Sequence, residues 1–366
     1  MKYFFGLVIL IHALIHSLGF VKAFSFTEIK TLTLPIVKWQ GLLWLLAMVV
    51  IMLYAIAWFT QYRFSWLLGF GAVILSQVLI VIFWKDAKFG TLPNAMMLIV
   101  SLLSYGSYRF QQQGNFETAE FIKQNKSATA ILREEEISGL PEPIKRWIRH
   151  SGVIGKPRIA IARITQLAEM KMKPDAQEWM GATALQYSST ENPGFIWTVN
   201  ANMNSWLNFQ GRDRLMDGNG EMLIKLYGLI TVVNASGPKV NEGSLQRYLG
   251  EMLWLPSLAL SPHIGWREVN DSTAIATMAY RGTTGSGTFY FNKEGDFVKF
   301  TAMRYQGNEP DSQRYEWILE VSDYAVFEGI KVPSKMTATW RLKEGDWTWL
   351  KLEVTDIRYN THAISQ

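Results

Sequence analysis

The stretch GTFYFNKEGDFVKFTAMRYQ, residues 287–306, decides the fold of the larger part of this chain. Apolar and polar side chains largely alternate on both sides of its centre, with the period of two that indicates a half-buried β-strand. At the centre, Gly295 precedes Asp296 and supplies the residue type that a tight hairpin turn needs at positive φ. A near copy of this turn, LKEGDW, lies at 342–347, and both convergent turn chemistry and internal duplication explain it. The stretch predicts two antiparallel strands joined by a short turn.

Alternation of the same kind continues on either side of this hairpin. Segments bounded by Gly, Asn and Asp fill most of residues 156–361 and predict about ten strands with short hairpins. Such a chain forms a twisted antiparallel sheet, a sandwich or an open barrel. We therefore expect a mainly antiparallel β domain over 140–366, curved into an open or half barrel. The Gly-rich run GTTGSG, 282–287, lies between strands rather than before a helix, so we interpret it as a turn.

Two segments of this domain break the alternation. An apolar helical face around Trp147 ends at Gly152 and predicts a short entry helix. The second segment, LQRYLGEMLWLPSLAL at 245–260, is nearly as apolar as a membrane span, but it is too short to cross a bilayer and Pro256 interrupts it. We predict an amphipathic capping helix over 242–255 that lies on the concave side of the sheet and either fills it or covers a cavity.

Composition separates the first third of the chain from the rest. Only 18% of the 366 residues are charged, against roughly 25% in soluble proteins. Four apolar runs are long enough to cross a hydrocarbon core of ~30 Å; they cover 3–20, 41–59, 66–84 and 89–108. We predict a four-helix transmembrane domain over 1–108, followed by a polar helical linker over 109–139. The protein is expected to be a multi-pass protein of the bacterial cytoplasmic (inner) membrane.

Two further features of these spans concern whether the first one is cleaved and which side of the membrane their ends face. A cleaved signal peptide over 1–23 is the alternative to the first span, but no small-x-small cleavage site follows it, so we expect a retained span. Basic residues are equal in number on the two sides of the spans, so the positive-inside rule gives no orientation.

Polar side chains within or beside the spans are candidate functional residues, because ionisable groups at membrane depth are costly and often functional. His12 and His16 share one helix face, and Ser76 or Gln77 on the third span are possible partners. The two histidines either hydrogen-bond inside the bundle or ligate a haem or a metal. Asp86, in WKDAKFGT, either belongs to an interfacial turn or contributes to a headgroup or ion site. We expect no metal and no cofactor, since no further histidine in the spans completes a site.

Several classes of function find no support in the sequence. The chain has no cysteine, which excludes disulfides, thiolate metal sites and cysteine nucleophiles. A net charge of +5 with scattered basic residues gives no reason to expect a nucleic-acid partner. No nucleophile elbow, phosphate loop or histidine cluster is present. An enzyme, which we do not favour, would depend on Glu251 or His263, with Asp217, Arg247 or Arg304 as partners.

The favoured hypothesis is a membrane-anchored protein that holds a lipid or other apolar ligand in the half-barrel, beneath residues 242–260. The aromatic side chains of this domain would equally fill a solid core, in which case the domain is a scaffold or a sensor with a protein partner. A hollow beneath 245–260 favours a ligand, a filled interior favours the scaffold, and converging polar groups favour an enzyme. The candidate ligand-binding residues are Trp197, Trp206, Tyr248, Met252, Leu253, Trp254, Leu255, Trp266 and Tyr305.

Five segments between 138 and 360 carry a resemblance to a known family. LPEPIKRWIRHSGVIGKPRI, GFIWTVNANM, RLMDGNGEMLIKLYGLITVV, LQRYLGEMLWLPSLAL and GIKVPSKMTATWRL resemble an uncharacterised bacterial family, catalogued as a domain of unknown function. HALIHSLGF and WKDAKFGTLPN resemble the four-span leader of its relatives in Bacteroidetes. The resemblance implies no activity and no catalytic residue. Relatives without a leader fit a cytosolic domain, which gives a slight preference for the cytoplasmic side. Long strands around a capping helix also resemble, in architecture alone, the LolA-like lipoprotein-carrier half-barrels.

Overall fold

The computed structural model describes residues 2–125, 130–203 and 207–361. The chain divides into two compact units. The first runs to Gln111 and includes Tyr227–Leu229, and the second contains the rest of the chain.

The first unit is a bundle of apolar helices, as the sequence predicts. Four helical segments are long and apolar enough to cross a membrane. Side chains on the outside of the bundle are apolar and exposed, such as Leu14 and Ile74, whereas Ala13 and Ala47 are fully buried where the helices meet. An apolar surface of this extent suits a hydrocarbon surrounding. The helices are α1 (Lys2–Ala23), α2 (Lys38–Phe59), α3 (Ser65–Ile82), α4 (Trp84–Ala87), the 3-10 turn η1 (Lys88–Gly90) and α5 (Thr91–Gln124), whose last part belongs to the second unit.

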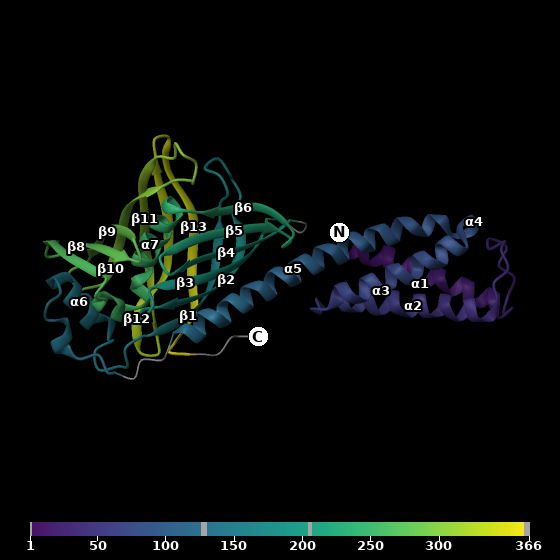
Figure 1. Ribbon diagram of the computed structural model, residues 1–366, viewed down its shortest axis with the longest axis horizontal. Helices are drawn as coiled ribbons and strands as arrows, with labels where there is room; N and C mark the ends of the chain where they lie inside the picture. The colour runs from purple at the N-terminus through teal and green to yellow at the C-terminus, as the bar shows by residue number, and fades with distance from the viewer. Residues whose placement is uncertain (1, 126–129, 204–206, 362–366) are drawn as a thin grey trace. The chain divides into compact units, whose positions relative to one another are not determined.

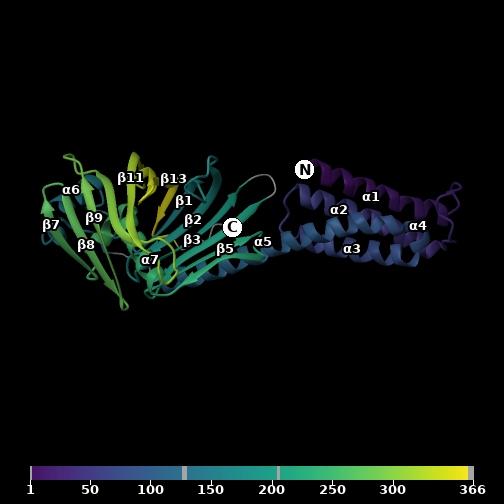
Figure 2. The same cartoon turned by 90° about the horizontal axis from the view of Figure 1, so that it is seen from above.

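The second unit is built on one antiparallel sheet of thirteen strands. Two meanders, β1–β6 and β7–β13, pair through β1 and β13, so that β6 and β7 form the two edges. The sheet curls into a half-barrel trough (Figures 1 and 2), which confirms the predicted fold class. The strands are β1 (Ile161–Met170), β2 (Met180–Ser189), β3 (Gly194–Asn202), β4 (Asn208–Met216), β5 (Asn219–Leu226), β6 (Ile230–Ser236), β7 (Ile264–Asn270), β8 (Thr273–Tyr280), β9 (Thr283–Phe291), β10 (Phe297–Tyr305), β11 (Arg314–Phe327), β12 (Ile330–Leu342) and β13 (Gly345–Tyr359).

The sequence pattern underestimated the number of strands. The alternation did not show β2, whose inward positions carry the small residues Ala182 and Ala184, or β7, an edge strand with mostly exposed side chains. Interpreting GTTGSG as a turn was wrong, because only Gly282, at φ 83°, lies in the turn and Thr283 already begins β9. The predicted hairpin turn is present, with Gly295 at φ 99°.

The segment that connects the two edges of the trough lies on its concave face. It consists of α7 (Pro238–Gly250) and the 3-10 turns η3 (Glu251–Trp254) and η4 (Pro256–Leu260). The α-helix begins earlier than the predicted 242–255, because Pro238 opens its first turn, and it tightens into 3-10 geometry after Gly250. It packs on β3–β6 of one wing and on β8–β10 of the other.

Glycines bring α7 close to the strands. A Cβ on Gly285 of β9 would lie 3.0 Å from the side chain of Gln246 in α7, and a Cβ on Gly220 of β5 would lie 2.4 Å from the hydroxyl of Ser244 in α7. The two 3-10 turns are sealed just as tightly, since Leu253 and Trp254 are at most 1% exposed. The interior beneath η3 and η4 is therefore filled with side chains.

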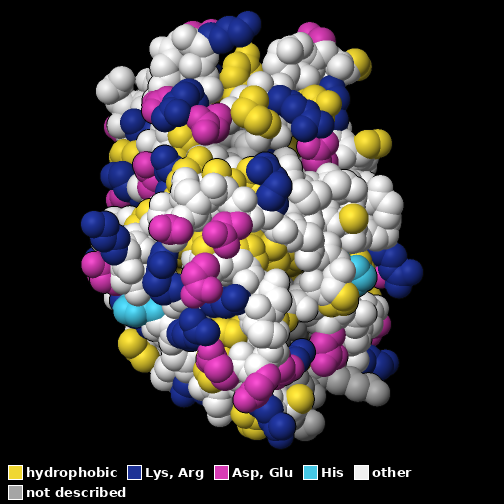
Figure 3. Space-filling model, turned by 90° about the vertical axis from the view of Figure 1, so that its left-hand side faces the viewer, with side chains coloured by type: hydrophobic (Ala, Val, Ile, Leu, Met, Phe, Trp, Pro, Cys, Tyr) yellow, Lys and Arg dark blue, Asp and Glu magenta, His cyan; other side chains and the backbone are white. Residues whose placement is uncertain are grey.

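Two further helical segments cover the sheet. The entry helix α6 (Glu142–Ser151) ends at Gly152 in the left-handed conformation, as predicted. It follows the 3-10 turn η2 (Glu134–Ile137). The last part of α5 packs on the outer face of β2 and β3, where Glu117 pairs with Arg212 at 3.0 Å. Basic and acidic side chains are interspersed on the face of the protein shown in Figure 3.

Candidate functional site

A charged cluster of Gln186, Asp213, Arg247 and Glu251 lies on the concave face beside α7. Arg247 donates from Nη1 to Asp213 at 2.9 Å, from Nε to Glu251 at 2.7 Å and from Nη2 to the side-chain oxygen of Gln186 at 3.2 Å. Gln186 donates in turn to Glu251 at 2.7 Å. One guanidinium group thus connects α7 to β2 and β4 and serves as ion-pair partner to two carboxylates.

Strand register explains how these residues meet. Gln186, Trp197 and Asp213 are direct cross-strand neighbours on β2, β3 and β4, so all three face the inside of the trough. The guanidinium carbon of Arg247 lies 4.9 Å from the centre of the Trp197 ring. The indole of Trp197 also donates to the side-chain oxygen of Gln166 at 2.8 Å. The cluster is held by stacking as well as by charge.

A second arginine on the same face has no such partners. The guanidinium carbon of Arg304, on β10, lies 4.1 Å from the ring centre of Trp317 and 5.7 Å from that of Trp340. Gly243 of α7 lies on the other side, where a Cβ would come within 3.3 Å of Nη2. Within the described parts of the chain, Arg304 forms no ion pair or hydrogen bond, and its buried Nε has no partner.

The pKa values of Arg304 and Arg247 are shifted in opposite directions. Burial lowers the pKa of Arg304 to about 9, and the nearby charge of Arg247 acts in the same direction. Burial also acts to lower the pKa of Arg247, but Glu251 and Asp213 together raise it above its ordinary value. For Asp213, burial raises the pKa against the opposing effect of Arg247. At neutral pH, Arg304 is charged, and Glu251, Asp213 and Glu242 are near enough to act on it, but no carboxylate of the described residues forms an ion pair with it.

Part of the concave face next to Arg304 stays accessible. Apolar inward-facing residues on β1, β3, β4, β12 and β13 are only partly buried. Small residues such as Ala182 and Ala201 connect them across the strands. The guanidinium group of Arg304 beside this apolar surface suits a molecule with an anionic end and an apolar body. This apolar wall consists of Met170, Val199, Phe209, Trp340 and Leu350.

The structure divides the residues that the sequence suggested for ligand binding. One group lies in the filled core beneath the 238–260 segment, where every member is at most 1% exposed: Tyr248, Met252, Leu253, Trp254 and Leu255. Trp197 belongs with the charged cluster. Trp266 is partly buried and donates to the carbonyl of Ala259 at 2.9 Å. Tyr305 stacks against Arg314. Trp206 lies outside the described residues.

The residues considered for an enzyme are also divided. Glu251, Arg247 and Arg304 come together on the concave face. Asp217 lies in the turn between β4 and β5, and His263, just before β7, contacts the ring of Tyr280 edge to face. Sequence reasoning missed Asp213, Gln186, Trp317 and Trp340. The signal available was parity, because Asp213 takes an inward position on β4, two residues before the fully buried Leu215.

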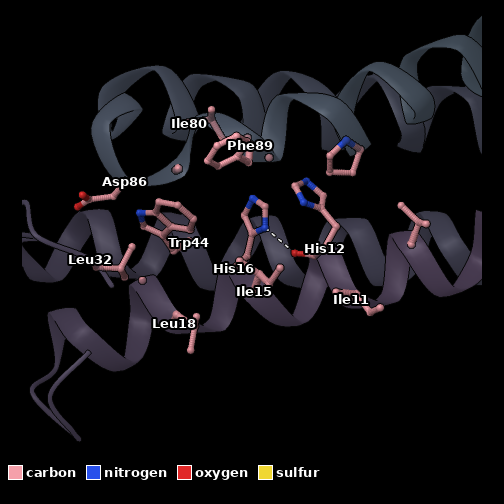
Figure 4. A pocket seen from close by; sticks show the side chains of 15 residues that line it. Ile11, His12, Ile15, His16, Leu18, Leu32, Trp44, Ile80, Asp86 and Phe89 are labelled. Atoms are coloured by element: carbon pink, nitrogen blue, oxygen red, sulfur yellow. Dashed lines mark hydrogen bonds between the residues drawn. The ribbon is translucent and has the colours of Figure 1, made fainter. Parts of the chain in front are cut away.

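Three of the five candidates within or beside the spans, His12, His16 and Asp86, line a pocket in the first unit (Figure 4). Its volume is about 370 Å³, and α1 contributes seven of its fifteen lining residues. His12 and His16 line this pocket and share the hydroxyl of Ser76, at 3.2 and 2.9 Å. Asn94, which the sequence did not suggest, lies 2.9 Å from His12 and donates to Gln77 at 3.0 Å. One hydrogen-bonded chain therefore joins four of the five candidates.

Asp86, the fifth candidate, organises a loop. Its carboxylate accepts the backbone N–H of Leu34 at 2.8 Å and the hydroxyl of Thr33 at 2.8 Å. The residues that the structure describes contain no group of three His, Asp or Glu side chains placed to hold a metal ion.

The β domain is similar to a protein family and to two solved structures. Residues 130–352 match a family described as "Family of unknown function (DUF6544)". The comparison with curated proteins finds no match. Among solved structures, a LolA superfamily protein from Nitrosomonas europaea is similar with a TM-score of 0.35 and 9% identity, over 59% of this chain and 91% of that chain. A beta-barrel-like protein of the DUF1849 domain from Brucella abortus is similar with a TM-score of 0.25 and 11% identity, over 55% and 98%. Because the family match covers more than half of the sequence, the chain belongs to the DUF6544 family of unknown function.

Proposed function

We propose that this chain is a membrane-anchored protein whose half-barrel binds an amphipathic molecule with an anionic end. Arg304 holds the anionic end, and the apolar body lies on the apolar wall. The observation that carries this proposal is the arginine between Trp317 and Trp340, which lacks an ion-pair partner in the described chain.

An arginine without an ion-pair partner on a partly buried face is costly, because it loses hydration that no ion pair replaces. Burial has already lowered the pKa of Arg304, which measures that cost. A carboxylate or phosphate would supply the missing partner, since guanidinium binds both through paired N–H groups. The stacked indoles hold the guanidinium plane in place, so little ordering remains for the ligand to impose.

The apolar wall gives the rest of the ligand its binding free energy. Burial contributes ~0.8 kcal/mol per CH₂ group, so about eight methylenes on the wall contribute about 6 kcal/mol. A molecule of this kind resides in membranes, and four apolar helices on the same chain would keep the half-barrel at its source. The filled core beneath η3 and η4 supports a ligand position beyond α7, beside Arg304, rather than under the 3-10 turns.

Binding of dodecyl phosphate to the full chain in a neutral detergent tests the proposal. We compare the wild type with Arg304→Gln and with the matched control Arg314→Gln, which removes an exposed arginine that pairs with Glu242. A hydrogen bond to a charged group contributes about 1.5–3 kcal/mol, so Arg304→Gln should weaken binding roughly 10- to 100-fold. Arg314→Gln should leave it unchanged. Equal affinity of the wild type and Arg304→Gln, or no binding by either, would contradict the proposal and favour a scaffold.

A further inference from the structure

The pocket of the helical unit has the form of a small-molecule site. Its volume of about 370 Å³ falls in the range of ~300–1,000 Å³ typical of ligand pockets. Ile11 and Ile15 line it and are about half exposed on the apolar surface of the bundle. His12 and His16 are almost fully buried. The pocket therefore runs from the apolar surface of the bundle to a polar end (Figure 4).

The hydrogen-bond partners of His16 determine which of its ring nitrogens carries the proton. A charged ring among apolar spans is costly, so each imidazole is neutral and carries one N–H. Nδ1 of His16 lies 2.8 Å from the backbone carbonyl of His12, which only accepts, so Nδ1 carries the proton. Nε2 of His16 is then an acceptor, and the hydroxyl of Ser76, 2.9 Å away, donates to it.

One ring nitrogen of His12 is an acceptor without a donor among the described residues. Its Nε2 lies 2.9 Å from the side-chain oxygen of Asn94 and 3.2 Å from Ser76, whose only proton is already committed to His16. Nε2 of His12 must therefore carry the proton, and Nδ1 keeps its lone pair. Among the described residues, no hydrogen-bond donor reaches this Nδ1. The edge of the ring next to it faces Gly90, another residue of the pocket lining, where a Cβ would come within 3.3 Å of Cε1.

We propose that this pocket binds an apolar molecule that carries a hydroxyl group, whose O–H donates to Nδ1 of His12. The shared chemistry is a neutral O–H donor on an apolar body, which a lipid alcohol or an alkyl hydroquinone supplies. This goes beyond the proposed function, because the pocket lies in the other unit of the chain and its ligand is neutral. The apolar part of the ligand lies against Ile11 and Ile15, and the lone pair of His12 selects for a donor.

Competition binding to the full chain in a neutral detergent tests this site, with radiolabelled dodecanol as the probe. Dodecyl methyl ether is the matched competitor, since it keeps the chain and lacks the O–H. The alcohol should compete about tenfold better than the ether, and competition by decylhydroquinone or by unlabelled dodecanol shows which of the two ligand types is preferred. If the ether competes as well as the alcohol, or if dodecanol does not bind, the proposal is wrong.

Substitutions then locate the site. Ile15→Trp fills the pocket, and Leu14→Trp places the same bulk on a neighbouring residue that does not line it; the two side chains are 52% and 50% exposed. Ile15→Trp should weaken dodecanol binding at least tenfold, and Leu14→Trp should not. His12→Gln keeps an amide donor for Asn94 and removes the Nδ1 acceptor, so the alcohol and the ether should bind equally well. Equal effects of the two Trp substitutions, or a preference for the alcohol that survives in His12→Gln, would overturn the assignment.

Discussion

Replacing Arg304 by methionine should stabilise the unliganded protein, although it removes the proposed anion contact. A pKa lowered from 12.5 to about 9 corresponds to about 5 kcal/mol if taken in full. Because the guanidinium group is only partly buried and solvent screens part of this cost, we expect a gain of about 1–3 kcal/mol. Methionine keeps contact with both indole rings through its flexible thioether, so packing is preserved.

The matched substitution Arg247→Met should have the opposite effect. It leaves Asp213 and Glu251 on the concave face without their shared counter-ion, and removal of one partner of a buried ion pair costs about 3–5 kcal/mol. Two arginines on the same face, stacked on similar rings, should therefore respond to the same substitution with opposite signs.

Thermal unfolding of the full chain in a neutral detergent, followed by tryptophan fluorescence, measures both changes. The stabilisation by Arg304→Met should be complete at pH 7 and should shrink above about pH 9. There the folded wild type releases the proton that its unfolded state retains, so its stability rises with pH. A lower melting temperature for Arg304→Met at pH 7 would refute the reasoning, because it would mean that Arg304 has a stabilising partner in the chain.

Three further results are expected. Gly287→Ala should destabilise the full chain by about 1–3 kcal/mol, because its Cβ would lie 2.2 Å from the Phe300 ring. The control Gly265→Ala, whose Cβ would have no atom nearer than 3.9 Å, should change stability by less than about 0.5 kcal/mol. Melting temperatures of the two variants check this. Tyr248→Phe should cost about 1–3 kcal/mol, since a buried backbone carbonyl of β2 loses its donor, and denaturant unfolding measures it. Binding of dodecyl phosphate should weaken as the pH rises through about 9, where Arg304 loses its charge, and equilibrium dialysis across that range tests it.

Local chemistry explains how much of the fold the sequence could predict. The turn at Gly295 needs positive φ and the helix end at Gly152 needs the left-handed conformation, and both requirements are visible in single residues. The apolar runs of the bundle are visible because hydrocarbon demands uninterrupted length. GTTGSG was misinterpreted because its glycines make room for side chains that are distant in the sequence. Gly285 leaves space for Gln246 of α7 and Gly287 for Phe300 of β10, and nothing within the run itself shows that need.

The candidate sites depended on pairings that the sequence does not contain. The spacing of His12 and His16 puts them on one face, but their link to Asn94 joins positions 82 residues apart and requires the packed bundle. Arg247 and Arg304 are alike in the sequence. What separates them is strand register, which brings Asp213 into an ion pair with the first and aromatic rings against the second.

The contrast between the two arginines also distinguishes a structural role from a binding role. Arg247 joins α7 to β2 and β4, and every group that it contacts compensates its charge, so the fold alone accounts for it. Among the described residues, Arg304 makes no hydrogen bond or ion pair that joins two elements, and we expect it to lower the stability of its domain. We infer that a residue with that balance has a partner from outside the chain. Arg304 and the apolar wall lie within residues 130–352, the part that matches the family, whereas His12 and its pocket lie outside that part. The anion site should therefore be sought in family members with or without the apolar helices, and the hydroxyl site only in those that have them.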